Sequence, residues 1–324
     1  MPMRSSLAKA KTFGRALVNA MASRKDVEPI WRARDFPPVN IKTLPVPRYD
    51  LLSNRTYSRY PVQTSRGCPW RCDFCASNVM LQETYRKRPV SEVVRDLEAI
   101  RKLKKRPFIE FADDNTFVDH AWGKELCRAI QPLGIKWFTE TDISVAEDEE
   151  LLRLMRDARC RQVLIGLESP DQASLEGLEL RTNFKHKQWS GYVDAVRRIQ
   201  SHGITVNGCF ILGLDHHTPA IFQQVFDYVM SIPLYEVQIT ILTPFPGTPL
   251  YARLLKEGRI LQPGRWDLCT MFDVNFVPKR MTVDQLRDGM FWLTERLYSE
   301  ASLAKRREPF FESLWHQQPH ELAH

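Results

Sequence analysis

Short apolar runs alternate with helical patterns along most of this chain. Between the runs, apolar residues recur every three or four positions, as Val93, Leu97 and Ile100 do, which predicts amphipathic helices. Alternation of strands with helices favours parallel pairing, because each parallel connection needs a crossover. The pattern therefore predicts an α/β fold with a parallel sheet covered by helices. The predicted strands are residues 60–65, 108–112, 135–140, 162–168, 205–213 and 235–242.

The number of strand and helix units limits the architecture. Six units, instead of the eight of a complete barrel, predict a partial (β/α)6 barrel. We expect an N-terminal leader and proline-rich connector over residues 1–59, the barrel over 60–280 and a helical extension over 281–324. Leu286 and Met290 begin a helical repeat in that extension, so we expect it to pack on the open side of the barrel.

Composition narrows the setting of the protein. Hydrophobic residues make up 43% of the chain, yet no apolar run approaches the roughly 18 residues that a membrane span needs. The formal net charge is +7, with basic side chains gathered near the amino end. No added nucleic-acid-binding module is visible, so a nucleic acid partner is not expected. We expect a cytoplasmic protein with no membrane span.

Three closely spaced cysteines carry the strongest chemical signal. Cys68, Cys72 and Cys75 lie in the segment TSRGCPWRCDFCASN, and three thiolates on one loop can hold three irons of a cubane iron–sulfur cluster. The fourth iron then binds something other than protein, such as a substrate or cofactor. Arg66 and Arg71 lie beside the motif, and their positive charge favours the thiolate form that binds metal.

Two plainer interpretations of these cysteines compete with a cluster. A structural zinc site needs four ligands, generally as two spaced pairs, and no second pair of Cys or His follows at suitable spacing. A disulfide is disfavoured, because the seven cysteines are scattered and no secretory signal is visible. The other four cysteines are widely dispersed, so a second cluster is not expected.

Polar segments follow the predicted strands. In barrels of this kind the chemistry lies at the carboxyl ends of the strands, so functional side chains are expected there. No residue in these segments is assigned a catalytic role from the sequence. The segments are residues 113–117, 139–142, 168–171, 214–217 and 243–249.

The CxxxCxxC spacing, with Phe74 before the last cysteine, resembles the radical S-adenosylmethionine (SAM) enzymes. The resemblance implies a [4Fe–4S] cluster on Cys68, Cys72 and Cys75, whose free iron is chelated by the amino and carboxylate groups of SAM. In that family the reduced cluster cleaves SAM to methionine and a 5′-deoxyadenosyl radical. The resemblance also implies a partial barrel with the cluster loop after the first strand, which agrees with the hydrophobic pattern.

The same resemblance implies which residues contact SAM. Phe74 stands at the family's aromatic position near adenine, and Asp114 lies where many members have a glycine-rich segment that contacts the SAM amino group. Glu168 and Ser169 resemble the polar pair near the ribose and amino group. Arg181 resembles the arginine that meets the SAM carboxylate. The residues that match the strand-five segment on adenine are Gly208, Ile211 and Gly213.

Structural roles are the alternatives to several of these assignments. This chain has carboxylates where the family has glycines around Asp114, so that match is one of position only. The alternative for Glu168 is a carboxylate that caps or closes a loop. The alternative for residues 208–213 is an ordinary core strand.

A narrower resemblance covers residues of about 45–280. The stretches LPVPRYDLL, FADDNTF, GLESP and TPFPGTPLY are similar to radical SAM enzymes that carry an amino-terminal cobalamin-binding domain. The roughly 45 residues before LPVPRYD are too few for such a Rossmann-like domain, and no DxHxxG-type loop is visible. We therefore expect a short form, a truncated product or one half of a split system with a separate cobalamin-binding partner. Cobalamin is a cofactor in doubt.

Two classes of function follow from these observations. In the first, the protein is a radical SAM enzyme that acts on a small-molecule or peptide substrate, by methyl or other group transfer. The resemblance implies a reducing electron donor of the flavodoxin or ferredoxin type. In the second, it is a non-catalytic iron–sulfur or zinc protein with a scaffolding or regulatory role. The cysteines together with Glu168 and Arg181 favour the enzyme, because a scaffold needs no SAM-facing polar set.

Overall fold

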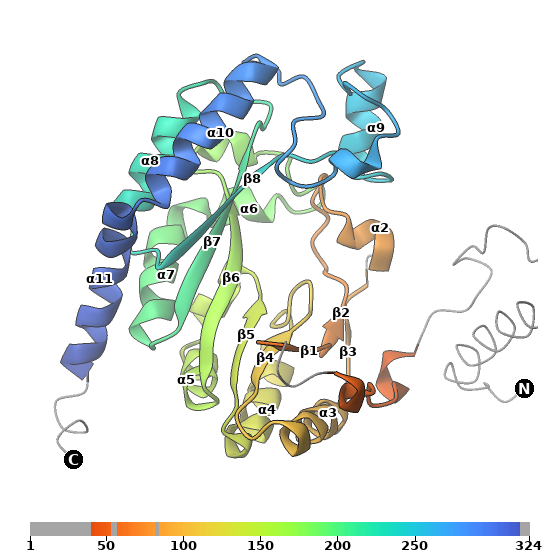
Figure 1. The fold of residues 1–324 in the computed structure, drawn as a ribbon, viewed down its shortest axis with the longest axis vertical. Coiled ribbons are helices and arrows are strands. Elements are labelled where there is room, and N and C mark those ends of the chain that lie inside the picture. The colour runs from red at the N-terminus through yellow and green to blue at the C-terminus, as the bar shows by residue number, and fades with distance from the viewer. Residues whose placement is uncertain (1–39, 53–56, 82–83, 318–324) are drawn as a thin grey trace, which may run out of the picture.

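A computed structural model of the protein describes residues 40–52, 57–81 and 84–317 (Figure 1). The strands are β1 (Tyr60–Val62), β2 (Ser65–Arg66), β3 (Arg86–Lys87), β4 (Phe108–Phe111), β5 (Lys136–Glu140), β6 (Cys160–Glu168), β7 (Thr205–Leu212) and β8 (Glu236–Ile241). The helices are α2 (Ser77–Leu81), α3 (Val90–Leu103), α4 (His120–Ile130), α5 (Glu149–Asp157), α6 (Phe184–Gln188), α7 (Tyr192–Ser201), α8 (Ile221–Ser231), α9 (Pro249–Lys256), α10 (Val283–Leu297) and α11 (Glu300–Gln317).

Six of the strands form one open parallel sheet. Their order is β1, β4, β5, β6, β7, β8, and every neighbouring pair is parallel. Within the described residues β1 and β8 do not pair, so the sheet does not close into a barrel. Figure 1 shows helices α3, α4, α5, α7 and α8 on the outside of this sheet. The predicted α/β fold with an open, six-stranded partial barrel is confirmed.

The helix-facing side of the sheet forms the core. Trp137 on β5 is fully buried, its ring packs 5.0 Å from that of Phe111 on β4, and its indole donates to the carbonyl of Ala158 at 2.7 Å. Full burial of a large apolar side chain contributes about 2–3 kcal/mol. Residues that alternate with the buried ones point to the opposite side, which we call the inner face. Gly166 and Cys209 lie on it and are less buried.

The first predicted strand, residues 60–65, was wrong in its extent. The parallel sheet keeps only β1, and the chain then turns away so that Ser65 and Arg66 pair with β3 in a short antiparallel ribbon. The cause is a distant carboxylate, because Asp113 after β4 accepts hydrogen bonds from the amides of Thr64 at 2.8 Å and Ser65 at 2.9 Å. The pattern of apolar residues around positions 60–65 gives no indication of this contact.

The C-terminal helices extend the outer layer. Helix α10 begins with a capping box, in which Thr282 and Gln285 exchange hydrogen bonds, and it packs against α8 and β8. Helix α11 packs against α7 and α8 (Figure 1). The hydroxyl of Tyr298 donates to the carbonyl of Val237 at 2.7 Å, which occupies an acceptor of β8 at the open end of the sheet. Among the described residues, no helix is both long and apolar enough to cross a lipid bilayer.

Candidate active site at the cysteine loop

The three cysteines lie on one turned segment, residues 67–76, which we call the cysteine loop. The loop leaves β2 and ends at α2. Gly67 adopts a φ of +83°, a conformation that favours glycine, and its amide donates to Asp114 Oδ2 at 3.1 Å. The amide of Cys75 donates to the carbonyl of Cys72 at 3.2 Å. The cysteines Cys68, Cys72 and Cys75 are therefore presented from a short loop at the carboxyl end of the first strand.

Backbone hydrogen bonds hold the loop against two distant segments. The amide of Asp73 donates to the carbonyl of Leu178 at 2.9 Å, next to a β-bridge between Cys72 and Glu179. On the other side, the amide of Leu250 in α9 donates to the carbonyl of Asp73 at 2.9 Å. The loop after β1 is thereby tied to the chain after β6 and the chain after β8, which fixes it across the mouth of the open barrel.

The surroundings of the thiols suit ligands of a cationic cluster. Burial raises the pKa of Cys68 to about 11, and burial also raises the pKa values of Cys72 and Cys75. The charge of each thiolate adds to this, since Cys68 and Cys75 both raise the pKa of Cys72. The raised pKa values favour the protonated thiols, and positive charge bound between the thiols favours the thiolates.

The cation that acts on Cys72 comes from a residue that the sequence analysis did not single out. Lys185 in α6 is the positive group whose charge lowers the pKa of Cys72. The guanidinium of Arg66 instead donates to the side chain of Gln63 at 2.7 Å. Lys185 lies more than a hundred positions after Arg66 in the chain, and the effect of Arg66 and Arg71 on the thiols stays a prediction.

No single-ion site is found among the residues that the structure describes, because no three Cys, His, Asp or Glu side chains converge on a point that could hold one ion. A zinc ion requires such convergence, with four ligands around one metal, whereas the thiolates of a cubane cluster each bind a different iron. The assignment of Cys68, Cys72 and Cys75 as cluster ligands stays a prediction.

An amide and a carboxylate after β4 and β5 support the first cysteine. The side-chain nitrogen of Asn115 lies 3.9 Å from the sulfur of Cys68 and 2.8 Å from Asp142 Oδ2. The indole of Trp70 donates to the same carboxylate oxygen at 2.8 Å. The amide of Asn115 therefore lies within hydrogen-bonding reach of the Cys68 sulfur, and its other contact fixes it against Asp142.

Asp113 and Asp114 hold the cysteine loop in place. Asp113 is buried and accepts from the amides of Thr64 and Ser65 and, at 2.8 Å, from the hydroxyl of Thr116. Burial raises the pKa of Asp113. Asp114 accepts from Gly67, directly before Cys68. The structure thus gives both carboxylates a loop-anchoring role, and the SAM contact of Asp114 stays a prediction.

Glu168 and Lys185 form a buried ion pair at the end of β6. Glu168 adopts a φ of +64° at a register shift between β6 and β7, and its Oε1 lies 2.7 Å from Lys185 Nζ. Their side chains are 7% and 12% exposed. Lys185 Nζ also donates to the carbonyl of Gly166 at 2.6 Å. A side chain at position 166 would clash with the Glu168 carboxylate, so the pair requires glycine there.

Ser169, the other half of the predicted polar pair, turns toward the loop after β7. Its hydroxyl oxygen lies 3.1 Å from Nε2 of the buried His217 and accepts from the amide of Asp171 at 3.1 Å. Burial lowers the pKa of His217 to about 4, so this imidazole is neutral at physiological pH. The contact of Ser169 with SAM stays a prediction.

Arg181 is exposed, and its neighbour Glu179 is the organising residue of this segment. The Glu179 carboxylate accepts from the amides of Arg71 at 3.0 Å, Arg181 at 3.1 Å and Thr182 at 2.7 Å. Burial opposes its ionisation, but hydrogen bonds from the Thr182 hydroxyl at 2.7 Å and from these amides prevail and lower the pKa of Glu179 to about 2. The carboxylate therefore joins the cysteine loop to the chain that leads into α6.

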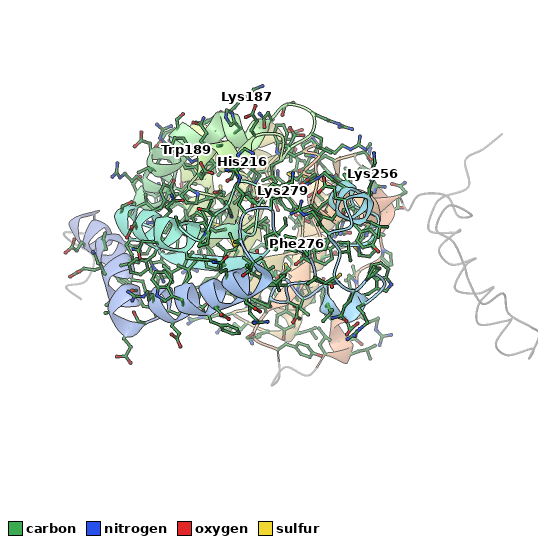
Figure 2. All side chains as sticks on the ribbon, turned by 90° about the horizontal axis from the view of Figure 1, so that it is seen from above. Lys187, Trp189, His216, Lys256, Phe276 and Lys279 are labelled. Atoms are coloured by element: carbon green, nitrogen blue, oxygen red, sulfur yellow. The ribbon has the colours of Figure 1, made fainter. Side chains whose placement is uncertain are left out.

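An ion network closes the rim of the site near α9. Arg253 lies 3.2 Å from Asp73 in the cysteine loop and 2.7 Å from Asp215 after β7, and Asp215 also pairs with Lys279 at 2.9 Å. A cleft of about 500 Å³ lies among these residues. Figure 2, the view from above, shows His216 and Lys279 near the middle of this face.

Comparison with protein families identifies the chain. The family model described as "Radical SAM superfamily" matches residues 62–229, which is more than half of the chain. The chain belongs to the radical SAM superfamily. A second model, described as a domain of unknown function, matches residues 248–323, where α9, α10 and α11 lie.

Several radical SAM relatives carry curated names. The chain is 28% identical over 83% of its length to an uncharacterized methyltransferase of Synechocystis, of which it covers 51%. It is 25% identical over 88% of its length to the bacteriochlorophyllide d C-12(1)-methyltransferase of Chlorobaculum tepidum, of which it covers 62%. It is 26% identical over 83% of its length to the hopanoid C-2 methylase of Rhodopseudomonas palustris, of which it covers 50%. The chain spans about half to three fifths of these relatives.

Two solved structures share the fold. The radical SAM methyltransferase TsrM from Kitasatospora setae, with cobalamin and a [4Fe-4S] cluster bound, matches with a TM-score of 0.53, 21% identity, and coverage of 63% of this chain and 41% of that one. The cobalamin-dependent SAM radical enzyme OxsB matches with a TM-score of 0.60, 17% identity, and coverage of 94% of this chain and 53% of that one. At these identities the match shows the fold alone.

The remaining residues matched to the radical SAM family lie in different layers. Phe74 is half-buried and packs against the core. Gly208 faces the helices, where an added Cβ would lie 3.0 Å from methyl groups of Leu167 and Leu234, whereas Ile211 alternates with it toward the inner face. Gly213 has a φ of +92°. Their contacts with SAM stay predictions.

Sequence reasoning missed four residues that contact or act on the cysteine loop: Glu179, Lys185, Asn115 and Asp142. All four act on the cysteine loop from segments far along the chain. One signal was available for Glu179, because a carboxylate between two leucines in LEL breaks an apolar run without a local partner. No comparable signal marks Lys185 among the four basic residues of RTNFKHK.

Proposed function

We propose that this protein binds a [4Fe–4S] cluster through Cys68, Cys72 and Cys75 and uses it to cleave SAM and transfer a methyl or related group. When bound, the cluster supplies an electron that breaks a carbon–sulfur bond of SAM, giving methionine and a 5′-deoxyadenosyl radical. The observation that carries the proposal is the cysteine loop itself, tied by backbone hydrogen bonds to the chain after β6 and after β8.

The residues of the chain would have separate tasks. Asp114 and Glu179 hold the cysteine loop through its amides, and Asp113 holds two residues of the β1–β2 segment just before it, so the ligands are preorganised before the cluster binds. Glu168 ends β6 at the inner face, which is the side of a barrel where substrates bind. We assign Glu168 to SAM, with Phe74 and Ile211 as apolar neighbours of the adenine.

Methyl transfer is the reaction class that the relatives favour, since three named above are methyltransferases or methylases. We propose a largely apolar, polycyclic small molecule as the substrate, because two of those names specify a bacteriochlorophyllide and a hopanoid. An apolar surface beside the open edge supports this. Trp266 is 50% exposed and Phe272 61% exposed, on a segment whose Met271 carbonyl accepts from the amide of Ile241 in β8 at 2.7 Å.

Two partners complete the proposal. A flavodoxin- or ferredoxin-type protein would supply the electron, and a cobalamin-binding protein would supply methyl carrier chemistry in a methyl transfer. A cytoplasmic location is consistent with both, since the electron donors are found there. The non-catalytic alternative gains nothing from the described residues, because a scaffold has no need of a buried ion pair beside the cysteine loop.

Anaerobic reconstitution tests the proposal. The protein is incubated with iron and sulfide, and bound iron, sulfide and zinc are quantified. SAM and dithionite are then added, and 5′-deoxyadenosine is measured by chromatography. We expect about four irons per chain and formation of 5′-deoxyadenosine. A chain that binds one zinc and leaves SAM intact would overturn the proposal.

A further inference from the structure

The Glu168–Lys185 ion pair is buried and has more contacts than a carboxylate that only closes a loop would need. Lys185 Nζ bonds both Glu168 Oε1 at 2.7 Å and the carbonyl of Gly166 at 2.6 Å, and both side chains are nearly enclosed. Glycine at position 166 leaves the space that the carboxylate fills. A buried ion pair contributes little net stability compared with apolar packing, so stability does not explain it.

The helix that carries Lys185 is fixed against the cysteine loop. The ring of Phe184, the preceding residue, stacks on Trp70 of the loop with centroids 4.0 Å apart and planes at 12°. Glu179, which bridges to Cys72, accepts from the amide of Arg71 in the loop and the amide of Thr182 before α6. These contacts place the ion pair at a set position beside the middle cysteine.

We propose that Lys185 is a positioning residue that holds Glu168 at the inner face and raises the reduction potential of the cluster bound by Cys72. The inference rests on the function proposed above. One-electron reduction adds negative charge to the cluster, and a buried cation nearby stabilises that charge more than an exposed one, because solvent screens it less. Glu168 opposes the effect, so the two members of the pair act on the potential with opposite sign.

Removing the positive charge of Lys185 and the negative charge of Glu168 in separate variants distinguishes an effect on the reduction potential of the cluster from a purely structural role. The variants Lys185→Met and Glu168→Gln are reconstituted beside the wild type, and the midpoint potential of the cluster is measured by titration with dithionite, followed by electron paramagnetic resonance. We expect a more negative midpoint for Lys185→Met and a more positive one for Glu168→Gln. The rate of 5′-deoxyadenosine formation with Lys185→Met should fall about tenfold or more. Unchanged midpoints, or shifts of the same sign, would overturn the inference.

Lys187 provides the matched control. It lies on the same short helix, two residues further on, and is exposed. Figure 2 shows it at the margin of the molecule. Lys187→Met removes an equal charge in a solvated place, so its midpoint should equal that of the wild type. A shift as large as that of Lys185→Met would mean that net charge alone is being measured, and would overturn the inference.

A double variant covers the case in which Lys185→Met fails to retain its cluster. Lys185→Met combined with Glu168→Gln leaves no unpaired buried charge, so it should bind about four irons per chain. Its midpoint should lie between those of Lys185→Met and Glu168→Gln, because two charges of opposite sign are both lost. A midpoint outside that interval contradicts the inference. Wild-type 5′-deoxyadenosine formation tests the proposed function independently of every midpoint.

Discussion

The chain after β4 and the chain after β6 occupy equivalent places at the carboxyl edge of the sheet, yet they use their carboxylates differently. After β4, Asp113 is buried and both of its carboxylate oxygens accept hydrogen bonds, from Thr64, Ser65 and Thr116. This carboxylate therefore anchors the chain that leads into the cysteine loop. After β6, Glu168 pairs with Lys185 at the inner face. The position of a carboxylate at a strand end predicts that it lies near the site. Its hydrogen-bond partners then show whether it anchors the backbone or is available to a ligand.

The largest effect should come from the loop that both regions support. Cys72→Ala removes one of three proposed ligands, so we expect loss of bound iron and no 5′-deoxyadenosine after reconstitution. Cys127→Ala, at a buried thiol in α4, is the control and should keep full iron content. Full iron in Cys72→Ala would mean that other residues hold the cluster.

Removing the anchoring carboxylate should cost stability more than removing the ion pair. Asp113→Ala leaves buried amides and hydroxyls without an acceptor, which we expect to lower the free energy of unfolding by about 3 kcal/mol or more. The double variant Lys185→Met with Glu168→Gln should change it by about 1 kcal/mol or less while slowing SAM cleavage about tenfold. Urea denaturation of the apo protein measures the free energy of unfolding of both variants. Equal losses of stability would erase the distinction between the two regions.

Acid should weaken the hydrogen bonds by which Glu179 joins the cysteine loop to the chain after β6. Its pKa is lowered to about 2 in the folded protein from an ordinary value of 4.5, so the folded state binds fewer protons than the unfolded state between these values. The carboxylate therefore contributes stability above pH 4.5, about 3 kcal/mol at most, which is lost as the pH falls toward 2. We expect the stability difference between wild type and Glu179→Gln to shrink over that range. A difference independent of pH would show that ionised Glu179 is not responsible.

The smallest effects should separate core from site in β7. Gly208→Ala places a methyl group 3.0 Å from buried side chains and should lower stability by about 1–3 kcal/mol with SAM affinity unchanged. Ile211→Ala, on the inner face, should weaken SAM binding. Calorimetric titration of SAM onto the reconstituted variants distinguishes them. A weaker affinity in Gly208→Ala alone would reverse the assignment.

The sheet and the cysteine loop were predictable because their signals are local. Apolar periodicity marks each strand and helix, and the spacing of Cys68, Cys72 and Cys75 lies within one loop. The end of β1 was not predictable, since it depends on Asp113, which lies 49 residues after Thr64. Parallel sheets bring such distant segments together at the ends of their strands. The ends of strands are therefore the features that the local sequence pattern predicts least well.

The buried cation of the site could not be predicted from the sequence. The family resemblance implied that Arg181 meets the SAM carboxylate, and that contact stays a prediction. The structure buries a second cation, Lys185, four positions later, which the sequence did not single out. Which of two nearby cations turns inward depends on the stacking of Phe184 on Trp70 and on the bonds of Glu179 to the cysteine loop. Neither contact leaves a mark in the local pattern.

The most direct test is the yield of 5′-deoxyadenosine per cluster in a single turnover. The reconstituted wild type is reduced with dithionite, freed of excess reductant and mixed with SAM, and the product is compared with that of Cys72→Ala. The account predicts 5′-deoxyadenosine approaching one equivalent per reduced cluster in the wild type and none in the variant. A reduced, four-iron wild type that leaves SAM intact would contradict it.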